Sequence, residues 1–256
     1  MKKFVKHKIE FPYKDKLEII AGTIQTDVIL FSGVLDSTTW KCFLGTIPTR
    51  DRLTMIIRGS GGFYYNDDLQ VTLGQHLRNN YSTINIIVMD YAKSALSLLS
   101  LSCDNLYLLK STSGIGTIDP KVLPKSCFEI VSPGNLEISD GRLTISNCCI
   151  DNSIKNEIEF SLNYSYESIK AGKIINHDKK FIRIFRTMLG IEEGCGVDFR
   201  QNHSKVIIKD HLIKIGLNIS KLDDSLTFKI LEVYELLMNE LQKKKDNFEY
   251  YVFEIQ

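Results

Sequence analysis

The sequence lacks an excess of charge of either sign. Its 256 residues carry 32 Lys and Arg against 31 Asp and Glu, so the formal net charge at pH 7 is +1. A balance of this kind gives no electrostatic reason to expect a nucleic-acid partner. The one basic run, at 243–245, is short and is interpreted as the solvated face of a helix.

The sequence also lacks a clear membrane span or secretion signal. The basic residues 1–8 are followed by Ile9-Glu10-Phe11-Pro12, which does not supply the apolar core of a signal peptide. Residues 84–102 form the most apolar stretch, but Asp90 and Lys93 interrupt it, which favours a buried helix over a membrane span. We therefore expect a protein without a membrane span that is located in the cytoplasm.

Motifs for disulfides, metals and nucleotides are missing as well. The six cysteines form no Cys-x-x-Cys pair, and without a secretion signal they are interpreted as reduced, mostly buried thiols. There is no phosphate-binding Gly-x-x-x-x-Gly-Lys loop and no His-Glu-x-x-His. The segment Gly114-Ile115-Gly116 has neither the spacing nor the acidic residue of a dinucleotide fingerprint. We expect no cofactor and no metal ion.

Apolar runs alternate with segments of helical period in the first half of the chain. The runs predict strands at 53–57, 84–89 and 105–109, and strands with a glycine break within 17–33. The periodic segments predict helices at 37–44, 67–79 and 94–103. This alternation indicates an α/β fold with a mostly parallel sheet and right-handed crossovers.

The pattern changes after residue 120. Turn residues and an alternating segment between 121 and 165 predict a hairpin or an ordered insertion. Further on, the spacing predicts helices at 181–189, 209–215 and 222–246 and a short strand at 249–255. We divide the chain into a domain at 1–220, with a divergent insertion at about 121–165, and a C-terminal helix and tail at 221–256.

One serine stands where a strand is predicted to turn into a helix. Ser94 follows the apolar run 84–88 and opens a second apolar stretch of helical length. At such a turn, the free backbone N–H groups of the helix start favour a developing oxyanion. The earlier run 53–57 ends in the glycine-rich segment 59–62, where glycine allows a backbone N–H to approach a substrate carbonyl closely. Together these segments predict half of an acyl-transfer site.

Four segments resemble the Clp protease superfamily. Residues 58–62 stand where that superfamily has its strand-ending Gly-Gly, and Ala92-Lys93-Ser94-Ala95 stands at its nucleophile position. Residues 111–120 resemble the Gly-Pro-Ile-Asp-Pro segment of the serine dehydrogenase proteinase family, a branch with the Clp fold. Residues 29–36 resemble the opening strand of Clp subunits.

The resemblance covers residues 27–122 and resumes around 201–218. It implies the Clp or crotonase-like spiral of ββα units, followed here by a C-terminal helical extension. It also implies a serine peptidase that acts on a peptide or protein substrate. Because members of this family commonly assemble into rings, we expect a homo-oligomer built from trimers or hexamers, and we allow for a protein regulator.

The resemblance also assigns roles to individual residues. Ser94 is the implied nucleophile, with Asp119 orienting His203, which is the general base. Without the resemblance, Asp119 is equally well interpreted as an Asp-Pro turn residue and His203 as an ordinary loop histidine. The backbone N–H groups of Gly62 and Ala95 are the implied oxyanion hole, although a glycine pair also fits a simple turn.

Three hypotheses about function remain open from the sequence. The first is a serine peptidase, for which Lys93 is a poor direct base because it adjoins Ser94, so that a structural or substrate contact is expected of it. The second is a crotonase-like acyl-CoA enzyme, which would need only paired backbone donors. The third is a catalytically inactive oligomeric partner-binding protein. Leu96, where a small residue is common, and the bulk of residues 63–65 are the departures that support this third hypothesis.

Overall fold

The computed structural model describes most of the chain. The described residues are 14–66, 68–118, 121–122, 125–126, 136–139, 142–146, 150–175, 181–190, 206–243 and 251–255. The helices within them are α1 (Lys14–Ile24), α2 (Ser37–Leu44), α3 (Leu73–Asn80), α4 (Ala95–Leu101), α6 (Asn152–Ala171), α7 (Phe181–Met188), α8 (Lys209–Ile215) and α9 (Asp224–Lys243).

The strands include both long core strands and short two-residue pairs. They are β1 (Asp27–Leu35), β2 (Arg52–Gly62), β3 (Tyr65–Asn66), β4 (Val71–Thr72), β5 (Thr83–Ala92), β6 (Asn105–Leu108), β7 (Gly114–Gly116), β8 (Lys121–Val122), β9 (Lys125–Ser126), β10 (Leu136–Ser139), β11 (Arg142–Ile145), β12 (Val206–Ile208), β13 (Ile219–Ser220) and β14 (Tyr251–Ile255). The helices predicted at 37–44, 94–103, 181–189, 209–215 and 222–246 are confirmed, with shifted ends for most of them.

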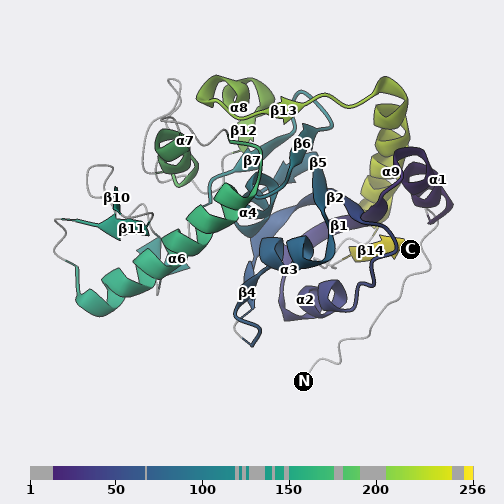
Figure 1. Cartoon of the computed structure of the whole chain (residues 1–256). Helices are drawn as coiled ribbons and strands as arrows, with labels where there is room; N and C mark the ends of the chain where they lie inside the picture. Colours follow the sequence, from purple (N-terminus) through teal and green to yellow (C-terminus); the bar gives the residue numbers. More distant parts are fainter. Residues whose placement is uncertain are drawn as a thin grey trace.

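A mostly parallel sheet forms the centre of the molecule (Figure 1). Within the described residues it has eight strands, in the order β12-β7-β5-β2-β1-β14, with β6 paired to β5 and β13 paired to β6. Strands β1, β2, β5, β6, β7 and β13 pair in parallel, whereas β14 and β12 join antiparallel at the two ends of the path. This arrangement confirms the predicted α/β fold and is compatible with a Clp-type architecture.

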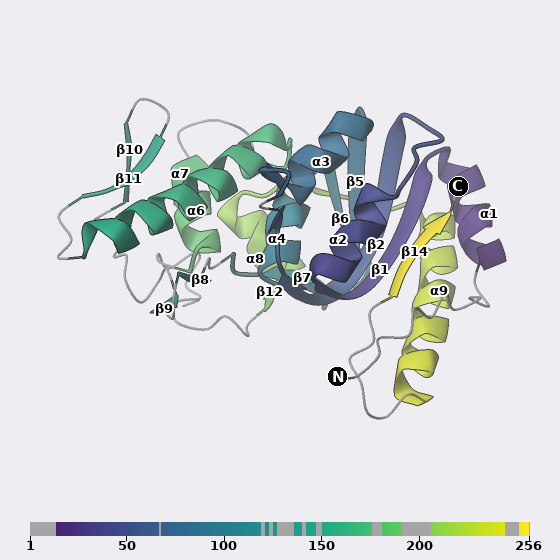
Figure 2. The same cartoon turned by 90° about the horizontal axis from the view of Figure 1, so that it is seen from below.

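Helices cover both faces of the sheet (Figures 1 and 2). Because side chains alternate along a strand, the sheet contributes apolar side chains to two separate clusters, one on each face. One cluster lies under α1 and α9 and contains Leu17, Ile20, Leu30, Ile56, Ile87, Ile230 and Val233. The other lies under α2, α3, α4 and α6 and contains Phe31, Phe43, Met55, Leu77, Val88, Leu96 and Leu162.

The prediction of strands within 17–33 is wrong for its first part, which is helix α1. The missed signal is the helical spacing of the apolar residues Leu17, Ile20 and Ala21, which are buried on one side of α1. Gly22, one of the two glycines in the range 17–33, lies on the exposed side of α1, where a Cβ would meet no atom within 4 Å. A glycine at such a position weakens a helix without ending it.

The helix predicted at 67–79 begins later, at Leu73. The described residues before it include β3 and β4, which pair antiparallel. The start is set by a capping box, because the Thr72 hydroxyl accepts a hydrogen bond from Gln75 N at 3.1 Å and the Gln75 side chain accepts one from Thr72 N at 3.0 Å. Leu69, which stands at helical spacing from Leu73 and Leu77 in the predicted range, is 48% exposed.

The C-terminal strand docks within the same chain. Residues of β14 pair with β1 from Val28↔Ile255 to Ser32↔Tyr251 and so cover the edge of the sheet (Figure 2). The apolar C-terminal end therefore finds a partner without a second subunit. Homo-oligomerisation stays a prediction that rests on the family resemblance.

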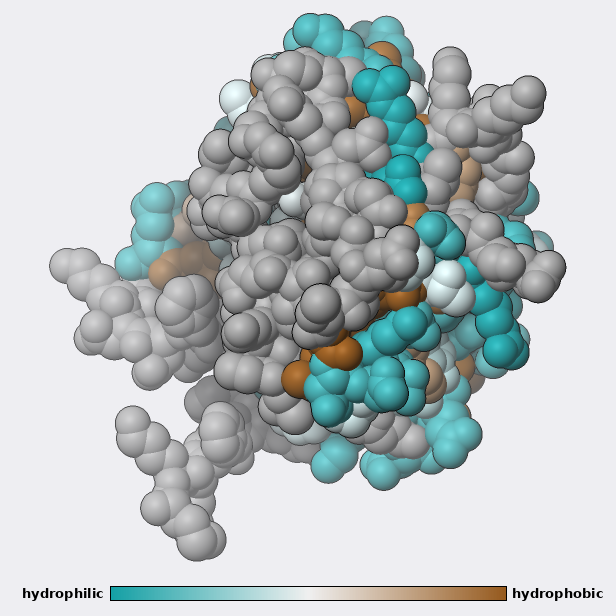
Figure 3. Space-filling model, turned by 90° about the vertical axis from the view of Figure 1, so that its left-hand side faces the viewer, coloured by the Kyte–Doolittle hydropathy of each residue, from teal (hydrophilic) through white to brown (hydrophobic). Residues whose placement is uncertain are grey.

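Helix α6 and the hairpin β10–β11 project together from the body of the molecule (Figure 1). Two hydrogen bonds of 2.9 Å join them, from Leu143 N to the Asn163 side chain and from that side chain back to Leu143 O. The hairpin predicted within 121–165 is thus confirmed by the antiparallel pairing of β10 (Leu136–Ser139) with β11 (Arg142–Ile145). Figure 3 views the molecule from this end, and the described side chains visible there are mostly hydrophilic, with small hydrophobic areas between them.

Two neighbouring isoleucines of α1 test this helix. Ile20 is fully buried on the sheet-facing side of α1, whereas Ile19 is 57% exposed. We expect Ile20→Ala to lower the free energy of unfolding by about 2–5 kcal/mol, because it leaves a cavity in the core. Ile19→Ala should stay within about 0.5 kcal/mol of the parent protein. Urea unfolding measures both, and similar losses for the two variants would contradict the helical placement of α1.

Candidate active site

A tight turn connects the end of β5 to the start of α4. Lys93 N donates a hydrogen bond to Gly59 O at 3.1 Å, and Ser94 N donates one to Thr117 O at 3.3 Å. Leu98 N then donates to Ser94 O at 3.0 Å, which is the first bond of the helix. The turn, which follows β5, is therefore held by Gly59 near the end of β2 and by Thr117 directly after β7, and Ser94 lies at this edge of the sheet.

Ser94 adopts a strained backbone conformation. Its φ of 51° and ψ of −120° lie outside the regions that L-residues favour. Among the described residues only Gln25, Gln70 and Ser94 are non-glycine residues with positive φ. Such a conformation costs about 1–3 kcal/mol and is characteristic of a nucleophilic serine on a strand-to-helix turn. The residue is half-buried, and its hydroxyl does not cap α4.

The glycines at the end of β2 lie directly against this turn. A Cβ placed on Gly61 would come within 2.6 Å of Ser94 Cβ and 2.9 Å of Ala95 N. A Cβ on Gly62 would come within 1.9 Å of Leu35 O. Both glycines have positive φ, of 96° and 128°. The backbone approaches the serine this closely only because Gly61 has no side chain, and the absence of a side chain at Gly62 allows the close contact with Leu35 of β1.

This packing puts candidate oxyanion donors beside the serine. Ala95 is the first residue of α4, so its N–H has no acceptor within the helix. Phe63 N is occupied, because it donates to Leu35 O at 2.8 Å. The backbone at Gly61 thus lies against both Ser94 and Ala95 N at the start of α4.

The bulk of Leu96 does not enter the site. Leu96 is fully buried in the core beneath the sheet, and its Cδ1 would lie 2.9 Å from a Cβ on Gly59. Glycine at position 59 therefore makes the space that Leu96 occupies. The departure of this residue from the family pattern is explained by core packing.

The three aromatic residues 63–65 differ in their burial and contacts. Phe63 is 65% exposed, and its carbonyl accepts a hydrogen bond from Trp40 Nε1 at 3.0 Å. Tyr64 is buried, with its hydroxyl 3.1 Å from Ser102 Oγ, and burial raises its pKa. Tyr65 joins the surface of α6. Only Phe63 therefore presents an exposed aromatic ring directly after the glycines.

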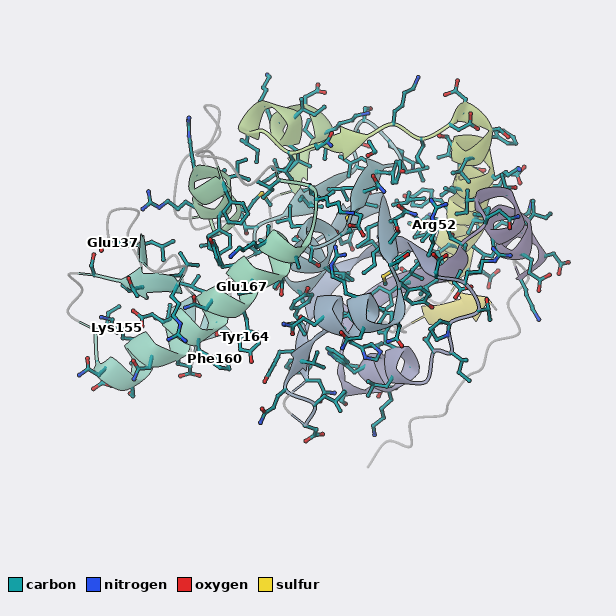
Figure 4. The ribbon with its side chains drawn as sticks, viewed as in Figure 1. Arg52, Glu137, Lys155, Phe160, Tyr164 and Glu167 are labelled. Atoms are coloured by element: carbon teal, nitrogen blue, oxygen red, sulfur yellow. The ribbon has the colours of Figure 1, made fainter. Side chains whose placement is uncertain are left out.

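An aromatic cluster that sequence reasoning missed connects this segment to α6. The rings of Tyr65 and Tyr164 have centroids 4.7 Å apart, and those of Phe160 and Tyr164 are 4.5 Å apart. Figure 4 labels Phe160 and Tyr164, one turn apart on α6. Their spacing of four residues was a possible signal, but nothing in the sequence indicates Tyr65 as their partner. The cluster fixes α6 relative to the segment that follows the glycines.

Two cations stand beside the turn. Arg58 Cζ lies 4.7 Å and Lys93 Nζ lies 5.0 Å from the centroid of the Tyr91 ring. Arg58 Nε is also 3.4 Å from Asp90 Oδ2. Lys93 thus has the structural contact that was expected, with Tyr91.

The two implied partners of Ser94, Asp119 and His203, lie outside the described residues. Their described neighbours belong to one region. Thr117 accepts the bond from Ser94 N, and Val206 of β12 pairs with Gly116 of β7.

Two other histidines lie within the described residues. His76 on α3 has Nε2 3.3 Å from Phe43 O, and its ring centroid lies 6.2 Å from that of Trp40. His211 lies on α8. The structure gives neither of them a contact with Ser94, so the described part of the chain supplies no histidine to this serine.

Other reactive or ligating groups do not gather at this turn. Cys103 is buried, and burial raises the pKa of its thiol, so it is held protonated and is not a nucleophile. Among the described residues no group of three or more His, Cys, Asp or Glu could hold a metal ion. No described helix is long and apolar enough to cross a membrane.

A shallow cavity of about 270 Å³ lies at the opposite ends of the strands. It is lined by Thr54 of β2, Asn85 of β5 and Tyr107 of β6, with Arg52 and Lys221 also in its wall. Figure 4 shows Arg52 far from α6, near α1 and α9. The cavity is thus separated from Ser94 by the length of the parallel strands and is not part of this site.

No family model and no curated protein matches the sequence. Among solved structures the chain is similar to a serine-to-alanine mutant of the 1510-N membrane-bound stomatin-specific protease. The sequence identity is 12%, the TM-score is 0.44, and 82% of each chain is covered. A likeness this distant does not transfer an activity to the chain.

Two glycines provide a matched test of the close approach at Ser94. We expect Gly61→Ala to lower the free energy of unfolding by more than about 2 kcal/mol, because the new Cβ collides with backbone and requires positive φ. Gly22→Ala, on the open side of α1, should raise it by about 0.5–1 kcal/mol. Urea unfolding of both variants checks this, and a harmless Gly61→Ala would show that the packing against Ser94 is wrong.

Proposed function

We propose that the chain is a serine hydrolase that cleaves peptide bonds and that Ser94 is its nucleophile. The observation that carries the proposal is the strained Ser94 on a strand-to-helix turn with Gly61 packed against it. A fold tolerates such strain when the surroundings hold it in place, and strained residues of this kind concentrate at active sites.

In the proposed reaction, Ser94 Oγ attacks the carbonyl carbon of the scissile peptide bond while a general base accepts its proton. The carbonyl oxygen then carries the negative charge, and we assign the N–H groups of Gly62 and Ala95 as the donors that stabilise it. The base next gives its proton to the leaving amine. Water activated by the same base hydrolyses the acyl-enzyme and restores the serine.

We assign the general base to His203 and its orienting carboxylate to Asp119. Asp119 follows Ile118 directly, and Thr117 is bonded to Ser94 N. His203 precedes Val206 by only three residues, and Val206 pairs with the strand that leads to Thr117. Since each residue spans at most about 3.8 Å, both assigned residues are connected by short segments to the neighbourhood of the serine.

Two observations favour this function over the alternatives. A crotonase-like enzyme would use the backbone donors alone and would have no need for the strain at Ser94. An inactive protein was suggested by the bulk of Leu96 and of residues 63–65, but Leu96 and Tyr64 are buried in the core, and of these residues Phe63 is the exposed one, at 65%. No described feature favours binding of coenzyme A.

A fluorophosphonate probe tests the nucleophile. We expect the parent protein to become labelled on Ser94, as located by peptide mass spectrometry, because the probe reacts with activated serines. Ser94→Ala should abolish labelling and lower hydrolysis by several orders of magnitude, while circular dichroism shows a folded protein. Ser60→Ala, at an exposed serine near the glycines, is the matched control and should keep the label. Labelling that survives in Ser94→Ala would overturn the assignment.

The assigned triad partners make a second prediction. His203→Ala and Asp119→Asn should each lower kcat by about 10³–10⁴-fold, because the serine loses its base or the base loses its correct tautomer. His76→Ala should leave kcat unchanged, since this histidine contacts Phe43 O. Peptide hydrolysis followed by fluorescence measures all three variants. Full activity of His203→Ala would require another base.

A further inference from the structure

The cations beside Ser94 form a cluster with one aromatic ring and one carboxylate. Arg58 and Lys93 both lie over Tyr91, at 4.7 and 5.0 Å from its ring centroid. The two cations are therefore within about 10 Å of each other. Asp90 is 3.4 Å from Arg58 Nε, and its side chain is 35% exposed. We call these four residues the Tyr91 cluster.

The Tyr91 cluster holds its cations without neutralising both of them. An aromatic face attracts a cation through its quadrupole, which positions the charge but adds no negative charge. Asp90 supplies a single carboxylate, and it contacts Arg58. In the part of the chain that the structure describes, the Lys93 ammonium makes no ion pair. One positive charge of the cluster is thus left uncompensated.

This charge lies next to the proposed nucleophile. Lys93 precedes Ser94 directly, and its N–H is bonded to Gly59, the neighbour of Arg58. A lysine side chain extends about 6 Å from its Cα, and an extended peptide advances about 3.3 Å per residue. A substrate bound across Ser94 therefore brings residues within about three positions of its scissile bond into reach of the cluster.

We infer that Arg58 and Lys93 form a subsite for a carboxylate of the peptide substrate. The carboxylate is either an Asp or Glu side chain or the C-terminal carboxylate, within three residues of the scissile bond. Arg58 offers a fork of N–H donors for bidentate binding, and Lys93 offers a compact point charge. The inference rests on the proposed function, because it describes the specificity of the same site.

Hydrolysis of matched peptides tests the subsite. A fluorogenic series carries Asp, Asn or Lys at each of the three positions on either side of the bond, and each peptide has a free or an amidated C-terminus. At one position we expect kcat/KM for Asp to exceed that for Asn by about fivefold and that for Lys by more. The preference should shrink at 0.5 M NaCl. If only the free C-terminus raises kcat/KM, the carboxylate is the terminal one.

Variants connect the preference to the cluster. Lys93→Met should reduce the Asp-over-Asn ratio to about one, Lys93→Arg should keep it, and Lys93→Glu should favour Lys over Asp. Lys170→Met is the control. Lys170 also lies over a tyrosine, 5.5 Å from the Tyr166 ring centroid, but on α6. It should leave the ratio unchanged. A merely structural Lys93 would change stability without changing this ratio.

The outcomes separate the inference from the function on which it rests. Labelling of Ser94 by fluorophosphonate together with equal kcat/KM for Asp, Asn and Lys at every position would overturn the subsite alone. A preference that persists in Lys93→Met and in Arg58→Met would also overturn it. Absence of both labelling and peptide cleavage would overturn the proposed function, and the subsite with it.

Discussion

The close approach of Gly61 to the turn at Ser94 is the constraint on which the rest of the site depends. A parallel sheet brings the carboxyl ends of its strands to one edge, so the end of β2 and the end of β5 meet there. They meet within van der Waals distance because Gly61 carries no side chain, whereas Gly59 leaves room for Leu96 of α4 and Gly62 packs against Leu35 of β1. A side chain at Gly61 would push the end of β2 away from the serine, however well the sheet formed.

The same contacts explain how the protein keeps a strained serine. Three backbone hydrogen bonds fix the turn, to Gly59 on one side, to Thr117 on the other and into α4. Beneath them, Leu96 and Ala95 are anchored in the core. The strain of about 1–3 kcal/mol is small beside the burial of two apolar clusters, each of whose large side chains contributes about 1.5–3 kcal/mol. The packing of the sheet therefore offsets the unfavourable conformational free energy at Ser94.

Hydrophobic periodicity correctly predicted the helices and strands in which the apolar residues of the pattern are the ones buried in the folded protein. The buried runs of β2 and β5 and the single-faced pattern of α9 are examples. It failed at α1, where a glycine was weighed above the spacing of Leu17 and Ile20, and at α3, where Leu69 fits the period but is exposed. It did not predict contacts between distant segments, such as Tyr65 with Tyr164. Hydrophobic periodicity shows which face of an element is buried, but it does not show which distant residue packs against that face. Ser94 and its glycines were found because turn chemistry is local, whereas Asp119 and His203 were assigned by resemblance and stay predictions.

The position of Lys93 bears on the remaining question of the general base. Serine hydrolases use either a histidine or a lysine for this role. Lys93 Nζ lies over the Tyr91 ring, 5.0 Å from its centroid, and this contact engages the ammonium with the ring and not with Ser94. His76 is engaged with the carbonyl of Phe43. Among the described strands, β12 pairs with β7 just before Thr117, whose carbonyl accepts the hydrogen bond from Ser94 N. His203, three residues before Val206 of β12, therefore stays the base that the family resemblance implies.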